Sequence, residues 1–448
     1  MRKIIMIFMF LGVLFTSKAQ ENLLSKEEAI SLALEKNFGI LVAKNDVSIA
    51  DNNQNVMNSG FLPSLQGVAG ANYNRDDSNI EFPGQVDENG VPRPDLELIQ
   101  AESQRYNAGL NLNYTLFDGL GRLYNYKILK EQYQISELQA KETIQNTILE
   151  LLSIYYEVAR LEENQNVQQQ TLEASKDRTR RAEYSFDYGQ STMLDVLNAE
   201  VDANTDSITL LNTQQLLKNT KRDLNVVLNQ NVDSTFEVDT LVTFIPQEEL
   251  LAMIDEADIN NLAILQTERN LAINEYDIKV SRSGYLPAVG LTGSYGWNLN
   301  QTADGAFFPG VNNTNLNLAL GASLSWNLFD GGATIIRVRN SKIAFENQEL
   351  IKKQIALEVN RDIQNAWETY QNRRAIYEIQ EKAVITNKNN FERSEEQYRI
   401  GRITNIVFRQ AQINLLNAQT IKNLAKYDAK LAELQLLQLT GQLLNVNF

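Results

Sequence analysis

Two very long stretches of this sequence contain no proline and only one interior glycine each. The seven prolines lie outside them, at positions 63, 83, 92, 94, 246, 287 and 309. The only glycine between positions 122 and 230 is Gly189, and the only one between positions 333 and 440 is Gly401. Proline interrupts a helix interior, whereas glycine accepts the positive φ that often ends a helix. Each stretch therefore predicts two long helices joined by a single turn, at Gly189 or at Gly401.

The first helix of each pair has a recognisable start. Asp118 and Asp330 stand just before the two stretches, and an acidic side chain is favoured where free backbone amides gather at a helix N-terminus. Helices over Gly119–Asp187 and Gly331–Arg399 would each extend about 100 Å at ~1.5 Å per residue. Apolar side chains recur along both stretches at nearly heptad spacing, which is typical of coiled-coil packing.

The sequence is a tandem repeat. GFLP at 60–63 returns as GYLP at 284–287, and LFDG at 116–119 returns unchanged at 328–331. The offset falls from 224 to 212 between these landmarks, which places an insertion in the first copy, around Asp76–Gln104. We therefore interpret residues 1–19 as a leader, 20–243 as the first structural repeat and 244–448 as the second.

Between the two landmarks of each copy the apolar period changes to two. Apolar residues alternate with small or neutral polar ones over four segments of about ten to thirteen residues, near 64–74, 106–116, 289–299 and 315–328. Such segments are long for soluble strands, and their polar faces hold almost no charge. The pattern indicates transmembrane β-strands with one lipid-facing side.

Composition excludes several function classes. The chain has no His and no Cys, so histidine-based triads, cysteine nucleophiles, Cys/His zinc sites and disulfides are absent. Its net charge of −15 disfavours a nucleic-acid partner. No carboxylate pair stands out from the charged helices, so we expect no enzyme activity, no metal and no cofactor.

The N-terminus predicts a secretory signal peptide over Met1–Ala19. Arg2 and Lys3 precede an apolar stretch, Ile4–Phe15, that is too short to be a membrane anchor. Ser17 and Ala19 supply the small residues of a cleavage site before Gln20. Elsewhere no apolar run approaches the ~20 residues of a membrane-spanning helix. We expect an exported chain.

Four strands cannot close a barrel in lipid, where no strand edge can remain unpaired. Because the smallest such barrels have about eight strands, the chain must oligomerise. The order of these features resembles the outer membrane efflux proteins of the TolC family over essentially the whole mature chain. The motifs that carry the resemblance are the Pro63 and Pro287 strand openings, both LFDG tetrapeptides, and helical turns similar to the family's Tyr-x-x-Gly-x-x-Ser/Thr segment.

The resemblance implies an α+β membrane protein. In it, long coiled-coil helices form a periplasmic α-barrel continuous with a transmembrane β-barrel, with four strands per chain and 12 in a homotrimer. It implies location in the outer membrane, contact with outer membrane lipid and an exit duct for tripartite efflux of small molecules. The partners would be a periplasmic adaptor (membrane fusion protein) and an inner-membrane transporter of RND or ABC type.

The resemblance also implies functional sites. Residues at the barrel/helix junction are Pro63, Asp118, Gly119, Pro287, Asp330 and Gly331. Tip turns that would dock the adaptor contain Tyr188, Gly189, Gln190, Ser191, Ile400, Gly401, Arg402 and Ile403. Acidic residues shortly before the second tip glycine would narrow the pore entrance. Glu392 and Glu395, nine and six positions before Gly401, are the candidates for two acidic rings, unless they are simply a solvated face.

Two other functions remain open at this point. The same duct could serve type I protein secretion, because the inner-membrane partner rather than the duct decides the substrate. A periplasmic coiled-coil adaptor or scaffold would share the long helices. It would not contain four alternating strands or duplicated LFDG motifs.

Overall fold

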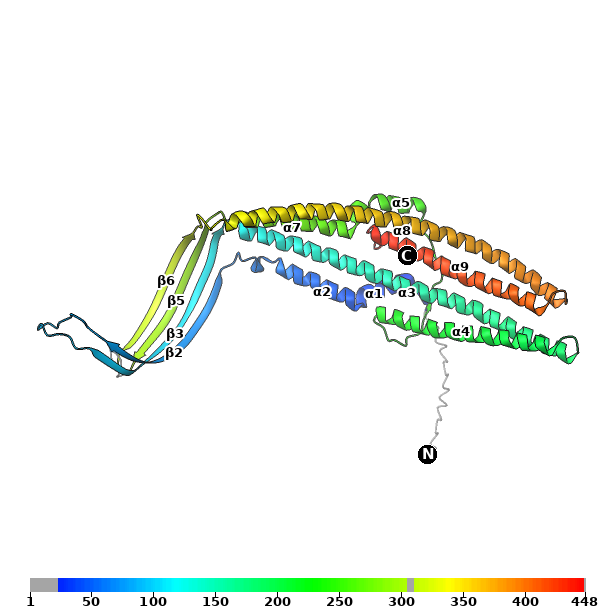
Figure 1. Ribbon diagram of the computed structural model, residues 1–448, viewed down its shortest axis with the longest axis horizontal. Coiled ribbons are helices and arrows are strands. Elements are labelled where there is room, and N and C mark those ends of the chain that lie inside the picture. The colour runs from blue at the N-terminus through cyan, green and yellow to red at the C-terminus, as the bar shows by residue number, and fades with distance from the viewer. Residues whose placement is uncertain (1–22, 304–309, 447–448) are drawn as a thin grey trace, which may run out of the picture. The chain divides into compact units, whose positions relative to one another are not determined.

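The computed structural model describes residues 23–303 and 310–446. The predicted signal peptide lies outside these residues. Figure 1 labels most of the elements. In chain order they are β1 (Leu23–Leu24), α1 (Lys26–Lys36), α2 (Phe38–Asn53), η1 (Val56–Asn58), β2 (Ser64–Ile80), β3 (Leu96–Asp118), α3 (Gly121–Asp187), α4 (Met193–Val227), β4 (Glu237–Val238), α5 (Gln247–Asp255), α6 (Ala257–Asn260), α7 (Leu262–Ser283), β5 (Ala288–Thr302), β6 (Asn312–Ser325), α8 (Ala333–Arg399) and α9 (Asn405–Leu439).

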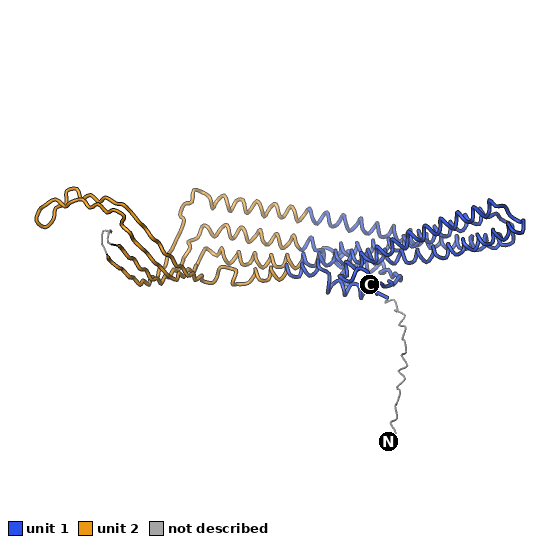
Figure 2. The backbone as a smooth tube through the Cα atoms, turned by 90° about the horizontal axis from the view of Figure 1, so that it is seen from below, with its two compact units in different colours: residues 1–46, 138–265, 354–448 blue, residues 47–137, 266–353 orange. Residues whose placement is uncertain are grey.

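The chain divides into two compact units, which Figure 2 colours separately. Unit 1 comprises residues 1–46, 138–265 and 354–448, and contains α4, α9 and the C-terminal parts of α3 and α8. Unit 2 comprises residues 47–137 and 266–353, and contains the larger sheet and the N-terminal parts of α3 and α8. Both copies of the repeat contribute to each unit.

The two predicted pairs of long helices are confirmed and match in length. Helices α3 and α8 have 67 residues each, and α4 and α9 have 35 each. Both long helices begin two residues later than predicted, because Gly119 and Leu120, and likewise Gly331 and Gly332, have positive φ and cannot be helical. No helix within residues 23–303 or 310–446 is long and apolar enough to cross a membrane.

The four predicted long strands form one antiparallel sheet in the order β2-β3-β5-β6. Its register aligns the apolar residues of neighbouring strands: Leu112 lies opposite Leu65, Tyr106 opposite Leu299, and Trp297 opposite Leu316. Because side chains alternate between faces, one face of the sheet is apolar and the other carries asparagine, serine, threonine and glycine. Among the described residues, β2 and β6 each pair along one edge only.

Two strand predictions were wrong at their ends. Strands β2 and β3 continue past a bulge at Asp76–Ser78 as a paired ribbon, so they extend beyond the predicted 64–74 and 106–116 into the predicted insertion, and only residues 81–95 connect them. The segment predicted to reach Leu328 ends at Ser325, because its partner β5 begins at Ala288, opposite Ser325. Pro287 precedes that pair and has no amide hydrogen to extend the ladder.

The core of unit 1 holds the segment that joins the two repeats. Tyr155 on α3 is fully buried, and its hydroxyl donates to Leu24 O at 2.7 Å and accepts from Asp239 N at 2.9 Å. Lys430 on α9 donates to Thr243 O at 2.9 Å, and the Glu433 carboxylate accepts from Ile245 N at 3.0 Å. The connection between the repeats is thereby fixed to buried polar groups of α3 and α9.

Candidate functional site

The turn between α3 and α4 is closed by Gly189, which has a φ of 69°. Gly189 N donates to Phe186 O at 2.8 Å and Gln190 N donates to Ser185 O at 2.7 Å, which is the Schellman pattern of a helix C-terminus. Thr192 then caps α4 through a reciprocal capping box with Asp195. These hydrogen bonds hold the Asp195 carboxylate, and they lower its pKa. The turn is therefore a well-defined, tightly closed structure.

The turn between α8 and α9 repeats this geometry 212 positions later. Gly401 has a φ of 72°, Gly401 N donates to Tyr398 O at 3.0 Å, and Arg402 N donates to Gln397 O at 2.8 Å. Thr404 caps α9. A Cβ added at either glycine would meet no atom within 4 Å, so the backbone conformation alone requires glycine there.

The predicted tip residues are largely accessible. Tyr188 is 79% exposed and Ile400 is 52% exposed. Gln190 and Arg402 are also exposed, and Ser191 and Ile403 are half-buried. Each of the two turns therefore presents both apolar and polar side chains to the surroundings.

The two predicted acidic candidates lie on the last turns of α8. Glu392 and Glu395 are both exposed. Lys388 Nζ lies 4.0 Å from Glu392 Oε1, and Arg399 pairs with the neighbouring Glu396 at 2.9 Å. At 100° per residue, Glu392 and Glu395 lie about 60° apart around the helix, so they occupy one side of it.

A stack of aromatic rings joins α8 to α9 behind the second tip turn. Tyr398 and Phe408 stack with ring centroids 4.8 Å apart and planes 2° apart, and Phe391 lies 5.5 Å beyond Phe408. Tyr398 is the tyrosine of the tip motif. Its half-buried position raises its pKa, so the ring stays neutral and packs as an apolar group.

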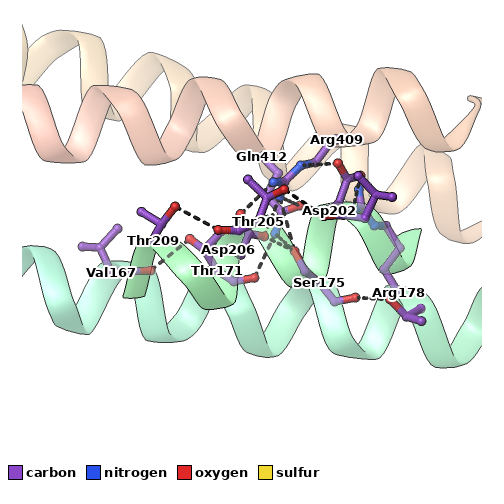
Figure 3. Close-up of polar contacts among 12 residues, drawn as sticks. Val167, Thr171, Ser175, Arg178, Asp202, Thr205, Asp206, Thr209, Arg409 and Gln412 are labelled. Atoms are coloured by element: carbon purple, nitrogen blue, oxygen red, sulfur yellow. Dashed lines mark hydrogen bonds and ion pairs between the residues drawn. The ribbon is translucent and has the colours of Figure 1, made fainter. Parts of the chain in front are cut away.

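A buried polar cluster lies further from the tips, where α3, α4 and α9 meet (Figure 3). The Arg409 guanidinium on α9 binds the Asp206 carboxylate on α4 through two contacts, at 2.8 Å and 2.7 Å. Ser175 on α3 donates to the same carboxylate at 2.6 Å. Gln412 accepts from Arg409 at 3.1 Å and donates to Ser175 at 3.2 Å. We call Ser175, Arg178, Asp202, Asp206, Arg409 and Gln412 the Arg409 cluster.

The second arginine of this cluster is less well satisfied. Arg178 Nη2 donates to Asp202 Oδ2 at 2.6 Å, and the side chain is only 1% exposed. Its Nε and Nη1 have no hydrogen-bond partner among the described residues. Burial lowers the pKa of Arg178, while Asp202 acts in the opposite direction. Two arginines and two aspartates thus balance in charge within the packed helices.

The Arg409 cluster was not predicted from the sequence, although one signal for it is present there. Asp206 falls in the heptad stripe that also contains the buried residues Val196, Ala199, Leu210 and Leu217. A carboxylate at such a core position requires a buried partner. The partner itself could not be identified, because Arg409 lies 203 positions away in the sequence.

The junction candidates lie around the helix-side end of the sheet in unit 2. The carboxylate of Asp118 accepts from Arg122 N, and that of Asp330 accepts from Thr334 N, both at 2.8 Å. Gly119 packs so closely that an added Cβ would lie 2.5 Å from Ser283 O. Pro63 directly precedes β2 and Pro287 directly precedes β5. These residues shape the change from strand to helix.

Comparison with known proteins identifies related chains. A family described as outer membrane efflux protein matches residues 29–230 and 253–442. The outer membrane efflux protein BepC of Brucella suis is 22% identical, covering 93% of this chain and 85% of BepC. The outer membrane protein TolC of Vibrio cholerae is 23% identical, covering 86% of this chain and 83% of TolC.

Solved structures share the fold at lower identity. The Campylobacter jejuni CmeC outer membrane channel superposes with a TM-score of 0.72 at 19% identity, covering 93% of this chain and 86% of CmeC. The outer membrane protein VceC of Vibrio cholerae gives a TM-score of 0.70 at 18% identity, covering 93% and 96% of the two chains. The helices and the sheet described above are therefore those of an outer membrane channel fold.

Proposed function

This chain belongs to the outer membrane efflux protein family, and from that premise we propose that it is the outer-membrane exit duct of a tripartite efflux machine. Members of this family are channels and not enzymes. The duct is a homotrimer that carries small molecules out of the cell. It works with a periplasmic adaptor and an inner-membrane transporter of RND or ABC type.

The unpaired edges of the sheet carry this proposal. Strands β2 and β6 each pair on one edge only within the described residues, and Leu316, Leu318, Leu320 and Leu324 of β6 are all at least 62% exposed. An apolar face suits lipid, but an open strand edge does not. Three copies joined edge to edge supply twelve strands and leave no edge, and the same rotation brings the long helices into a second tube.

The two tip turns are the proposed adaptor contact. They have the same backbone geometry and exposed side chains, so a trimer would present six similar turns at the far end of its helices. An adaptor with helical hairpins could meet them end to end. Type I protein secretion is the alternative use of the same duct, since it would need the same tip and differ in the inner-membrane partner.

Site-directed photo-cross-linking tests this function. A photoreactive residue that replaces Gln190 or Arg402 in the living cell should capture the adaptor. Separately, deleting the gene for this chain should make the cell more sensitive to toxic small molecules. The same residue at Asn89, in the 81–95 connection, serves as the control and should capture no adaptor. Equal capture from all three positions, or none from the tips, would contradict the docking proposal.

The proposed pore entrance makes a separate prediction. If Glu392 and Glu395 line it, threefold symmetry gives two rings of carboxylates, and such rings favour cations. The double variant E392Q/E395Q should lower the cation-to-anion permeability ratio in planar bilayers about severalfold, as the ring charge is lost. The control E346Q/E349Q changes two exposed glutamates at the same spacing on α8 and should leave the ratio unchanged. An unaltered ratio in the first variant would assign Glu392 and Glu395 to a solvated surface.

A further inference from the structure

The two ends of the four-stranded sheet carry opposite charge. At the end formed by the β2–β3 ribbon, residues 76–102 contain eight acidic side chains and one basic one, Arg93. At the other end, the adjoining residues 118–130, 278–286 and 330–345 contain eight basic side chains and two acidic ones, Asp118 and Asp330. This is unexpected in a chain with a net charge of −15. The basic residues are Arg122, Lys127, Lys130, Lys279, Arg282, Arg337, Arg339 and Lys342; we call them the junction belt.

Most of the junction belt is available to an external anion. Lys130, Arg282, Arg337, Arg339 and Lys342 are exposed. Within residues 23–303 and 310–446, none of these five side chains forms an ion pair with a carboxylate, whereas Arg122 pairs with Asp118 and Lys279 with Glu275. The unpaired cations come from α3, α7 and α8, so the positive charge surrounds the junction instead of following one helix.

Aromatic rings hold several of these cations in place. Tyr124 on α3 and Tyr276 on α7 stack at 6.2 Å, and the ammonium groups of Lys127 and Lys279 lie 5.2–5.6 Å from both ring centroids. Lys130 lies 4.6 Å from the ring of Tyr126. Both lysines thus lie close to the same two rings, whose faces attract cations. Amphipathic rings beside cations are typical of the polar boundary of a membrane.

The distances fit a lipid headgroup layer. A bilayer adds about 5–7 Å of headgroup on each side of its hydrocarbon core. Lys130 lies nine residues from the first residue of α3, or about 13 Å along the axis at ~1.5 Å per residue. Long basic side chains can extend several ångströms back along the surface toward a phosphate. Arg122, Arg282 and Arg337 lie nearer still to the strand ends.

We propose that the junction belt binds the headgroups of anionic phospholipids on the periplasmic face of the outer membrane. This inference rests on the proposed function, which puts the sheet in that membrane and the helices in the periplasm. Phosphate groups there are the anions at the right depth, and their charge complements the belt. The acidic opposite end of the sheet would disfavour the same lipids, so the belt also helps to fix the direction in which the chain sits in the membrane.

Lipid-dependent heat stability of the purified oligomer tests the belt. Phosphatidylglycerol added to the detergent-solubilised protein should raise the temperature at which the oligomer dissociates, since a ligand of the native state stabilises it. Phosphatidylethanolamine and inorganic phosphate at equal concentration should raise it much less, and 0.5 M salt should abolish most of the effect through screening. Native mass spectrometry should show phosphatidylglycerol retained on the wild-type oligomer.

Matched variants separate the belt from charge in general. In K127Q/K130Q/R337Q/K342Q, phosphatidylglycerol should raise the dissociation temperature of the oligomer by no more than half as much as in the wild type. The control K141Q/K176Q/K218Q/K382Q removes four exposed lysines elsewhere on the helices, none of which forms an ion pair within the described part of the chain. This control should keep the full rise in dissociation temperature. If the belt variant does not assemble, the salt and lipid comparison on the wild type decides.

The outcomes distinguish this proposal from the proposed function. Lipid binding by the belt is overturned if phosphatidylglycerol raises the dissociation temperature of the belt variant as much as that of the wild type. It is also overturned if phosphatidylethanolamine or free phosphate stabilises the wild type as much as phosphatidylglycerol does. If both variants still fractionate with the outer membrane, the duct proposal stands regardless. If the wild type itself is absent from that membrane, the function fails and the belt proposal fails with it.

Discussion

At the scale of single residues, the most consequential contact is the ion pair between Arg409 and Asp206. Both side chains are at most 10% exposed, and the pair links α9 to α4 with Ser175 of α3 as a third partner. A buried pair contributes little net stability compared with apolar residues of the same size. Removing only one of the two charged side chains is costly, because the other charge then stays buried without its partner. We therefore expect the pair to select one particular packing of these three helices.

The variant D206N tests this role. Losing one carboxylate should lower stability by about 3–5 kcal/mol, as for other half-broken buried pairs, and heat dissociation of the oligomer should shift to a clearly lower temperature. The double variant D206L/R409M removes both charges and should recover most of the loss. If D206N melts like the wild type, the cluster has no such structural role.

Two adjacent tyrosines provide a second residue-scale prediction. Tyr155 and Tyr156 are both fully buried, and burial raises the pKa of each. The Tyr155 hydroxyl has two hydrogen-bond partners, whereas the Tyr156 hydroxyl has none among the described residues. Y155F should therefore cost about 1–3 kcal/mol, while Y156F should be neutral or stabilising.

Thermal melts of Y155F and Y156F, measured side by side, provide the comparison. Each variant is the control for the other, since both remove one hydroxyl from the same turn of α3. The reverse order of melting temperatures would show that the connection between the repeats is not held through Tyr155.

At the scale of elements, the sequence was most informative where backbone chemistry is restrictive. The single glycines at 189 and 401 predicted both tip turns, because a positive φ is easily accepted only by glycine. Alternation predicted all four long strands. It failed at Trp326–Leu328, where the pattern continues but the partner strand has ended. It also failed in the β2–β3 ribbon, where polar residues pair through backbone hydrogen bonds that side-chain polarity does not reveal.

The site was predictable only in its local parts. Tip residues follow from a local motif. The Arg409 cluster depends on contacts between side chains more than 200 positions apart, and no local pattern identifies the partner of Asp206. The basic residues of the junction belt can be read in the sequence, but they lie in three separate segments. Only the fold shows that these segments meet at one end of the sheet.

The second tip turn makes a prediction about backbone conformation. Gly401 has open space around its Cβ position, so G401V should be disfavoured by backbone strain alone, at about 1–2 kcal/mol. G401N should be much milder, because asparagine tolerates the left-handed region. Adaptor cross-linking from Arg402 should fall in G401V and persist in G401N. Equal cross-linking in both would mean that docking does not need this turn.

At the scale of the whole molecule, a single copy of the chain leaves strand edges and apolar surface uncovered. The sheet has unpaired edges at β2 and β6 within the described residues, and extensive apolar surface remains exposed on β6, α8 and α4. Copies of the chain can cover both. A dimer would give eight strands and a trimer twelve, so strand closure alone does not choose between them. The proposed function assigns three copies.

The number of chains in the assembled channel is the sharpest test of the proposed twelve-stranded duct. Native mass spectrometry of the protein extracted from the outer membrane would measure it without any label or partner. We predict a single species that contains three copies of the mature chain. A species with one, two or four copies would contradict the proposed twelve-stranded duct.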